Sequence, residues 1–334
     1  MKLRANDTVA TQLESSPRRT LGSISFDQAF VPIVVIVMAL YLCITNPFFF
    51  TVTNLTNLLL QGSILAIVAF GITFVIISGE LDLSVGAGMA LVSVVVALTA
   101  RHFESIGIGI LLGLSIGLLI GLINALVVTL LEVPSFIGTL GMLVIAQGCA
   151  LALSQGAVVS GLPEGFSSLS NTRIFGLHLI VWLVALYFMV LLFIQKYTVF
   201  GLRVFAVGAN RRASVVTGIS TRRIISICFV ISGFSMAFAG VALTTRVESG
   251  QPNAGSLLAL TAVAAVVVGG TSILGGRGSI VRTLWGVLLI TILENGLDLE
   301  GIDPDVKRIV IGVVFILAAS TDFARRQFDR RKHK

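Results

Sequence analysis

Residues 54–78 form one uninterrupted apolar segment, NLTNLLLQGSILAIVAFGITFVIIS, that contains no Asp, Glu, Lys or Arg. An α-helix rises about 1.5 Å per residue, so this segment would exceed the roughly 30 Å thickness of the hydrocarbon core of a bilayer. Similar segments recur along the chain on both sides of this one. The stretch therefore predicts a helix that crosses a membrane, and it sets the interpretation of the rest of the sequence.

The composition supports the same fold class. Hydrophobic residues make up 56% of the 334 residues and charged residues only 12%, whereas charged residues make up about 25% of an ordinary soluble domain. A soluble globular protein is therefore excluded, and we predict an all-α polytopic membrane protein with about ten transmembrane helices. The predicted spans are 28–49, 54–78, 86–100, 106–131, 134–153, 177–195, 224–245, 259–274, 283–297 and 306–321.

The distribution of Lys and Arg predicts the orientation of the chain. Eighteen of the 23 basic residues lie in four segments, which are 1–27, 196–223, 275–282 and 322–334. By the positive-inside rule these segments, and with them both termini, are expected in the cytoplasm. The predicted organisation is a cytoplasmic amino tail, a transmembrane domain over 28–321 and a basic cytoplasmic tail. Because the basic residues are spread over short segments, nucleic-acid binding is not expected.

Two patterns predict how the spans pack. Spans two to five and spans seven to ten have nearly equal lengths and would start on opposite sides of the membrane, which is typical of an inverted repeat. In the fourth span, glycines recur at every fourth position and so share one helix face, where another backbone can approach closely. These glycines are Gly109, Gly113, Gly117 and Gly121.

The basic connection between the sixth and seventh spans, residues 196–223, has features of a short helix. It reads KYTVFGLRVFAVGANRRASVVTGISTRR and contains no acidic residue. Asn210 is suited to cap a helix that opens with Arg211 and Arg212, and Gly218 is suited to close it in a left-handed turn. We expect this helix to lie along the membrane surface.

The apolar side chains of this connection indicate that it does more than fix the topology. Residues such as Val204, Val216 and Ile219 would not be needed in a solvated basic loop. The pattern favours a docking helix for a cytoplasmic partner. A plain topology anchor is the alternative that the sequence leaves open.

Four stretches resemble motifs of one family, the permease subunits of ribose-type ABC sugar importers. The resemblance covers FGLRVFAVGANRRASVVTGIS at 200–220, GELDLSVG at 79–86, VPSFIGTLG at 133–141, and VGGTSILGGRG at 268–278 with NGL at 295–297. It implies a coupling segment for ATPase subunits formed by Gly208, Asn210, Arg211, Arg212, Gly218 and Ile219. At four positions, Glu80, Ser214, Arg282 and Glu294, the chain departs from the residues that the family commonly has.

The resemblance also implies the partners and the location of the chain. Two cytoplasmic ATPase subunits would bind ATP and Mg²⁺, so this chain would bind no cofactor itself. An extracytoplasmic solute-binding protein would deliver substrate, and a second permease subunit would complete a homodimer or a pair with a close paralogue. The location would be the inner membrane of a bacterium, in contact with membrane lipid.

Polar side chains within or beside the spans are candidates to line a substrate path, because they are costly in hydrocarbon. Asp82 and Ser84 lie between the second and third spans, where they could face such a path or cap the start of the third span. The others could equally form hydrogen bonds between helices. They are Asn124, Thr139, Gln147, Glu294 and Asn295, with Phe136 as a surface for stacking a sugar ring.

The sequence thus predicts the translocation subunit of an ATP-driven importer for a monosaccharide or related polyol, working by alternating access. It contains no grouping of nucleophile, base or metal ligands, so neither catalysis nor a metal site is expected. Two alternatives remain. One is an ion-coupled secondary transporter or channel, in which Glu294 would be a natural coupling group, and the other is an ABC permease for branched-chain amino acids.

Overall fold

The computed structural model of the protein describes residues 26–314 and residue 316. It confirms the all-α polytopic class. The predicted amino and carboxyl tails fall outside the described residues, apart from the start of α2. The elements are α2 (Phe26–Thr45), α3 (Val52–Ile77), α4 (Val85–His102), α5 (Ile106–Thr129), α6 (Ser135–Ser154), α7 (Phe166–Asn171), β1 (Arg173–Ile174), β2 (Leu177–His178), α8 (Leu179–Tyr197), α9 (Val199–Ala209), α10 (Arg211–Val216), α11 (Thr221–Val247), α12 (Leu258–Val268) and α13 (Ile280–Leu299).

Seven of the described helices are long and apolar enough to cross a membrane, namely α3, α4, α5, α6, α8, α11 and α13. The first predicted span corresponds to α2, and the tenth begins as a helix at residue 304. The eighth predicted span is wrong in its extent. Only the 11 residues of α12 are helical there, and they rise about 16 Å. The chain leaves the helix at Gly269 and Gly270, the second of which has a φ of +94°.

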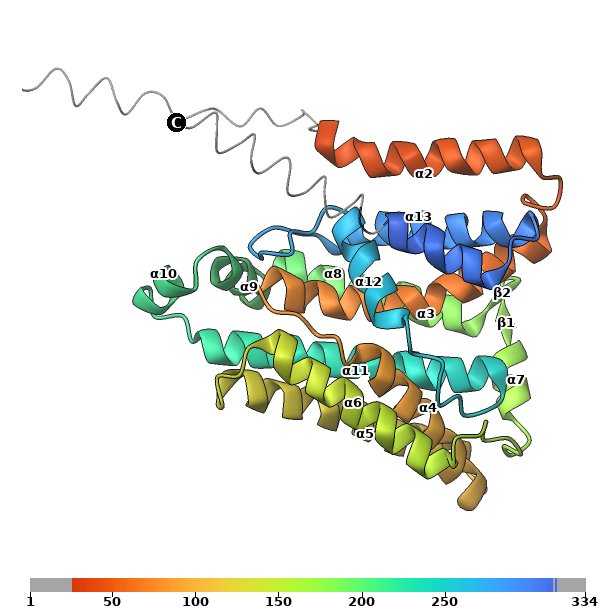
Figure 1. The fold of residues 1–334 in the computed structure, drawn as a ribbon, viewed down its shortest axis with the longest axis horizontal. Helices are drawn as coiled ribbons and strands as arrows, with labels where there is room; N and C mark the ends of the chain where they lie inside the picture. The colour runs from red at the N-terminus through yellow and green to blue at the C-terminus, as the bar shows by residue number, and fades with distance from the viewer. Residues whose placement is uncertain (1–25, 315, 317–334) are drawn as a thin grey trace, which may run out of the picture.

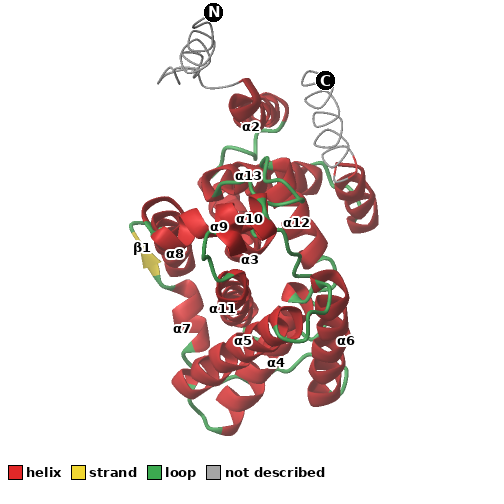
Figure 2. Cartoon of the chain, turned by 90° about the vertical axis from the view of Figure 1, so that its left-hand side faces the viewer, coloured by secondary structure: helices red, strands yellow, loops and turns green. Residues whose placement is uncertain are grey.

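Helices α3 and α11 form the centre of the bundle and run in opposite directions (Figures 1 and 2). The short helices α9 and α10 lie at one end of α3, which we call the α10 end. Helix α7 and the two-residue strands β1 and β2 lie at the other end, which we call the α7 end (Figure 1). The two ends are thus built differently.

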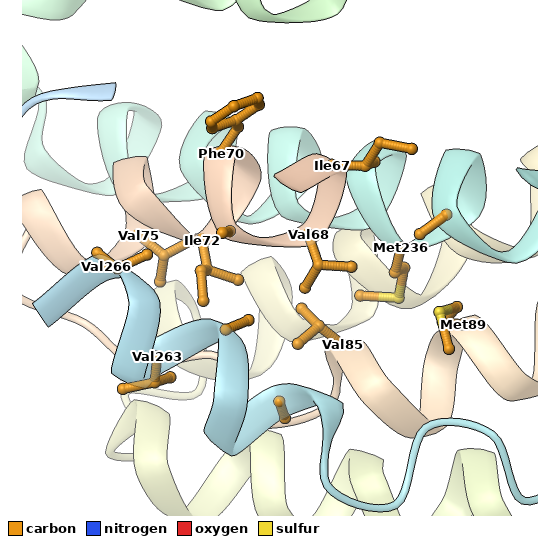
Figure 3. Close-up of a cluster of buried hydrophobic side chains, with 14 of the residues drawn as sticks. Ile67, Val68, Phe70, Ile72, Val75, Val85, Met89, Met236, Val263 and Val266 are labelled. Atoms are coloured by element: carbon orange, nitrogen blue, oxygen red, sulfur yellow. The ribbon is translucent and has the colours of Figure 1, made fainter. Parts of the chain in front are cut away.

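The core is centred on α3, which is buried on nearly all sides. Val68, Ile72 and Val75 of α3 face α12, whose Val263 and Val266 pack against them (Figure 3). By contrast, α2, α5, α6 and α8 expose many large apolar side chains, since a helix that faces lipid needs no polar side. The apolar run that starts at residue 54 therefore forms the centre of the protein rather than its rim.

Two non-helical connections lead from opposite ends of the bundle toward its centre. Residues 78–84 return from the α10 end to the start of α4, and residues 248–257 return from the α7 end to the start of α12 (Figure 1). The first turn of α4 touches the second connection at two glycines, because a Cβ on Gly86 would lie 2.2 Å from the carbonyl oxygen of Gly255. A long helix, a non-helical connection and a shorter helix thus occur twice, in opposite directions. An inverted repeat would produce this order, and superposition of the two halves is the test of that prediction.

The glycine stripe of α5 is in close contact with two neighbouring helices. A Cβ on Gly109 or Gly113 would meet α4, and one on Gly117 or Gly121 would meet α11. At Gly121 the added carbon would lie 2.6 Å from the carbonyl oxygen of Phe229, which is backbone and cannot rotate away. The predicted packing role of the stripe is confirmed.

We therefore expect Gly121→Ala to destabilise the bundle. Overpacking of this kind costs about 1–3 kcal/mol, and the measurement is the midpoint of thermal unfolding in detergent. Gly107→Ala is the matched control, because Gly107 lies in the same helix and a Cβ there would have nothing within 4 Å. Equal midpoints for the two variants would contradict the close approach of α5 and α11.

Candidate functional site

The buried connection 78–84 is held by the start of α6. The N–H of Leu81 donates to Oγ of Ser135 at 3.1 Å, and the N–H of Leu83 donates to Oγ1 of Thr139 at 3.2 Å. The Thr139 hydroxyl in turn donates to the carbonyl of Ser135 at 2.8 Å. These bonds satisfy backbone groups that could find no water inside a membrane protein. The motifs at 79–86 and 133–141 are therefore one structural unit.

Asp82 lies within this unit and is almost completely buried. Its Oδ1 accepts from the N–H of Ser84 at 3.0 Å and from the Ser84 hydroxyl at 2.6 Å. Its Oδ2 accepts from the hydroxyl of Ser232, near the middle of α11, at 2.7 Å. No Lys or Arg forms an ion pair with Asp82 in the part of the chain that the structure describes. The carboxylate is thus solvated by hydroxyls and by the start of α4.

Asn124 of α5 completes the cluster. Its Nδ2 donates to Oγ of Ser84 at 2.8 Å, while its Oδ1 is buried and has no hydrogen-bond partner among the described residues. We call Asp82, Ser84, Asn124 and Ser232 the Asp82 cluster. Ser84 stands at the N-cap of α4, yet its side chain does not bond to the helix backbone. Its hydroxyl donates to Asp82 instead, and Asp82 accepts from the N–H of Ser84, the N-cap residue itself. No side chain among the described residues therefore caps the first turn of α4.

The basic connection contains the helix that the sequence predicts. Asn210 is the N-cap of α10, with its Oδ1 accepting from the N–H of Ala213 at 3.0 Å. The helix opens with Arg211 and Arg212 and is closed after Thr217 by Gly218, which has a φ of +80°. The side chains of Val215 and Val216 are 58% and 87% exposed. This helix therefore offers a small apolar surface at the α10 end.

Helix α9, which precedes α10, is fixed against the interior of the bundle. A Cβ on Gly208 would lie 1.8 Å from the carbonyl oxygen of Ile77, so only glycine fits at that position. The same carbonyl accepts from the N–H of Gly276 at 2.8 Å. The end of α3, the end of α9 and the glycine-rich loop at 268–278 are thus in backbone contact. Three of the four motifs meet at this corner.

The two arginines of α10 differ in their surroundings. Nη1 of Arg211 lies 2.9 Å from Oε1 of Glu80, in the connection that leads to Asp82. Arg212 is exposed on the surface of α10. Ile219 is partly buried against the core, and its N–H donates to the carbonyl of Ser214 at 2.9 Å. Of the predicted coupling residues, Arg212 is therefore the freest to meet another protein.

The remaining candidates lie away from the Asp82 cluster. Nε2 of Gln147 donates to the carbonyl of Pro252 at 3.0 Å, which ties α6 to the connection 248–257. Asn295 exchanges two side-chain hydrogen bonds with Asn54, at 2.8 and 2.9 Å, and so joins α13 to α3 near the α7 end. Glu294 is partly buried beside this pair, and Phe136 is 51% exposed. For Asn295 the structure provides the helix-to-helix contact that the sequence left as an alternative, whereas Gln147 bonds to a connection between helices.

An apolar cavity of about 210 Å³ lies between α3, α8 and α13, lined by residues that include Leu58, Gly62, Val184 and Thr291. Its lining has almost no polar surface. A sugar needs precisely placed hydrogen-bond partners, so this cavity does not fit a sugar.

Removal of the Ser232 hydroxyl should destabilise the protein, because it leaves one oxygen of the buried Asp82 carboxylate without its donor. The expected cost for Ser232→Ala is about 1–3 kcal/mol, measured as a lower midpoint of thermal unfolding. Ser63→Ala is the control, since Ser63 is also buried but donates only to Leu59 of its own helix, at 2.6 Å. If both variants unfolded at the same temperature, Ser232 would not be solvating the carboxylate.

A bundle of apolar helices with non-helical connections inside it, and with an exposed short helix at one end, is typical of membrane transport proteins. The chain belongs to the family described as branched-chain amino acid transport system / permease component, which it matches over residues 54–319. It is thus a transport subunit rather than an enzyme, and a multi-pass membrane protein.

The chain is 40% identical over 288 residues to the ribose import permease protein RbsC of Bacillus subtilis, which covers 86% of this chain and 89% of that protein. It is 34% identical over 331 residues to the L-arabinose transport system permease protein AraH of Escherichia coli, which covers 98% of each chain. No solved structure matches the chain. The resemblance that the four motifs indicate is confirmed.

Sequence reasoning missed three polar residues that bond to the candidate residues or to the connection around Asp82. Ser135 stands inside a recognised motif, so its position gave a signal. Ser232 and Asn54 gave none, because a single serine or asparagine in an apolar helix does not indicate its partner. Their roles depend on contacts between positions that are 150 and 241 residues apart in the chain.

Proposed function

We propose that this chain is the transmembrane subunit of an ATP-driven importer that carries a monosaccharide or a related polyol into the cytoplasm by alternating access. The proposal rests mainly on the arrangement at the α10 end. There an exposed helix is in direct contact with the connection that leads to the Asp82 cluster. A partner that moves this helix would therefore act on the interior of the bundle.

The substrate class rests on the relatives. The family description names branched-chain amino acids, but the relatives compared above are ribose and arabinose permeases, and they match the chain over most of its length. A sugar is also suited to the polar groups near the centre of the bundle. The unpartnered Oδ1 of Asn124 is an acceptor of the kind that a sugar hydroxyl requires.

The proposed partners bind at the two ends. ATPase subunits, which would hold ATP and Mg²⁺, dock on the surface formed by Arg212, Val215 and Val216. A solute-binding protein docks at the α7 end, on the surface around α7, β1 and β2. A second permease subunit covers part of the exposed apolar surface. This arrangement places the α10 end in the cytoplasm of a bacterium and the chain in its inner membrane.

Within this proposal the path candidates divide into two groups. Asp82, Ser84, Asn124 and Thr139 fix the buried connection and set the shape of the interior. Gln147, Glu294 and Asn295 lie between the cluster and the α7 end, where a substrate entering from outside would pass. Phe136 lies at the start of α6, on the α10 side of the cluster.

Val216→Glu and Arg212→Glu should each weaken docking of the ATPase subunit. We expect recovery of that subunit on co-purification in mild detergent to fall by about fivefold, since a central interface residue is worth more than about 1 kcal/mol. Phe175→Glu is the matched control. Phe175 is 93% exposed but lies at the α7 end, so this variant should recover the subunit as the wild type does.

The outcomes separate the possibilities. Lower recovery of the ATPase subunit in the two α10 variants, but not in Phe175→Glu, supports docking on α10. If the wild type recovers no ATPase subunit, the proposed function fails. If Phe175→Glu lowers recovery equally, the docking surface is not on α10.

Glu294→Gln tests the ion-coupled alternative. A carrier that moves its substrate with a proton or cation through Glu294 would lose transport in this variant. The proposed importer should keep ATP-dependent uptake, because its energy enters at the α10 end. The measurement is uptake of labelled sugar into proteoliposomes, with and without ATP. Uptake that needs Glu294 and an ion gradient, but no ATP, would replace the proposal.

A further inference from the structure

Glu80 forms an ion pair that joins two distant parts of the chain. Its Oε1 lies 2.9 Å from Nη1 of Arg211, which is 131 residues away and opens α10. The Glu80 side chain is only 12% exposed, so the carboxylate has lost most of its water. A second ion pair at the same end, Glu132–Arg222, is 71% and 59% exposed. In the Glu80 pair, unlike the Glu132 pair, the carboxylate is mostly shielded from water and needs the charge of its partner in place of that water.

The backbone at Glu80 is fixed to the bundle. Its N–H donates to the carbonyl of Val75 at 3.1 Å, which secures it to the end of α3. The next residue, Leu81, is bonded to Ser135, and Asp82 follows it in the cluster. Only Leu81 separates Glu80 from Asp82, which accepts hydrogen bonds from Ser84 at the start of α4.

Helix α10 has few other contacts of its own. It packs chiefly against α9 and the start of α11, and of its six side chains only that of Ser214 is buried. Helix α9 is fixed at Gly208 by the close contacts with Ile77 and Gly276. Arg211 is the α10 side chain that reaches the connection 78–84, through its ion pair with Glu80.

We propose that Glu80 is a positioning residue of the transport cycle. Through Arg211 it holds α10 against the connection 78–84, so that a movement imposed on α10 is passed to Asp82 and to the first turn of α4. This inference rests on the proposed function, because it takes α10 as the helix that an ATPase subunit moves.

The first test measures transport by the assembled complex in proteoliposomes. In Glu80→Gln the ratio of sugar imported to ATP hydrolysed should fall by about threefold, the range expected of one partly exposed ion pair. Recovery of the ATPase subunit should stay unchanged, because the Arg212, Val215 and Val216 surface is intact. Glu132→Gln is the matched control, with the same change of charge in the exposed pair, and it should behave as the wild type.

A charge exchange separates positioning from simple loss of stability. Glu80→Arg and Arg211→Glu should each impair transport, and the double variant should restore it, since the pair is re-formed with its charges reversed. A double variant as poor as the single ones would overturn the proposal. So would a Glu80→Gln variant that couples transport to ATP hydrolysis as well as the wild type does.

The second test needs no partner. Spin labels placed at Val216→Cys in α10 and Leu274→Cys in the glycine-rich loop, with Cys43 and Cys149 replaced by alanine, report the distance between α10 and the bundle in the full chain. Glu80→Gln should broaden the distance distribution and Glu132→Gln should not. An unchanged distribution would overturn the positioning role. If positioning is confirmed but no ATPase subunit binds the wild type, the proposed function fails and the coupling role fails with it.

Discussion

The buried carboxylate of Asp82 is the constraint on which the interior of this protein depends. A charge in the middle of a membrane protein is costly unless protein groups replace its water. Here Ser84 and Ser232 supply the donors, and Asn124 orients Ser84. These residues come from the start of α4, from α11 and from α5, so solvating one carboxylate fixes the relative positions of three helices. The start of α6 secures the backbone on either side of Asp82.

The glycines allow the same region to be compact. Connections without helical hydrogen bonds are tolerated at membrane depth only where protein encloses them. Gly86 and Gly255 let the first turn of α4 touch the connection 248–257, and Gly208 lets α9 contact the end of α3. As a result, the exposed helix α10 is separated from the Asp82 cluster by only a few residues of well-fixed backbone. This short link gives the proposed coupling its physical basis.

Local signals in the sequence were sufficient for much of the fold. The apolar runs located the helices, the spacing of four predicted the packing face of α5, and Asn210 with Gly218 predicted both ends of α10. The early end of α12 was missed, because Ile273 and Leu274 continue the apolar run beyond the glycines that break the helix. The Glu80–Arg211 and Asn54–Asn295 pairs could not be predicted. Their partners are joined only by the tertiary fold, and neither residue of a pair indicates the other.

The central claim is that energy from an ATPase subunit enters at α10 and moves a sugar through the bundle. The most direct measurement is uptake of labelled ribose and arabinose into proteoliposomes that contain this chain, its ATPase subunit and its solute-binding protein. The account predicts uptake that requires ATP and that unlabelled leucine does not compete with. Uptake that proceeds without ATP, or that leucine abolishes while unlabelled sugar does not, would contradict it.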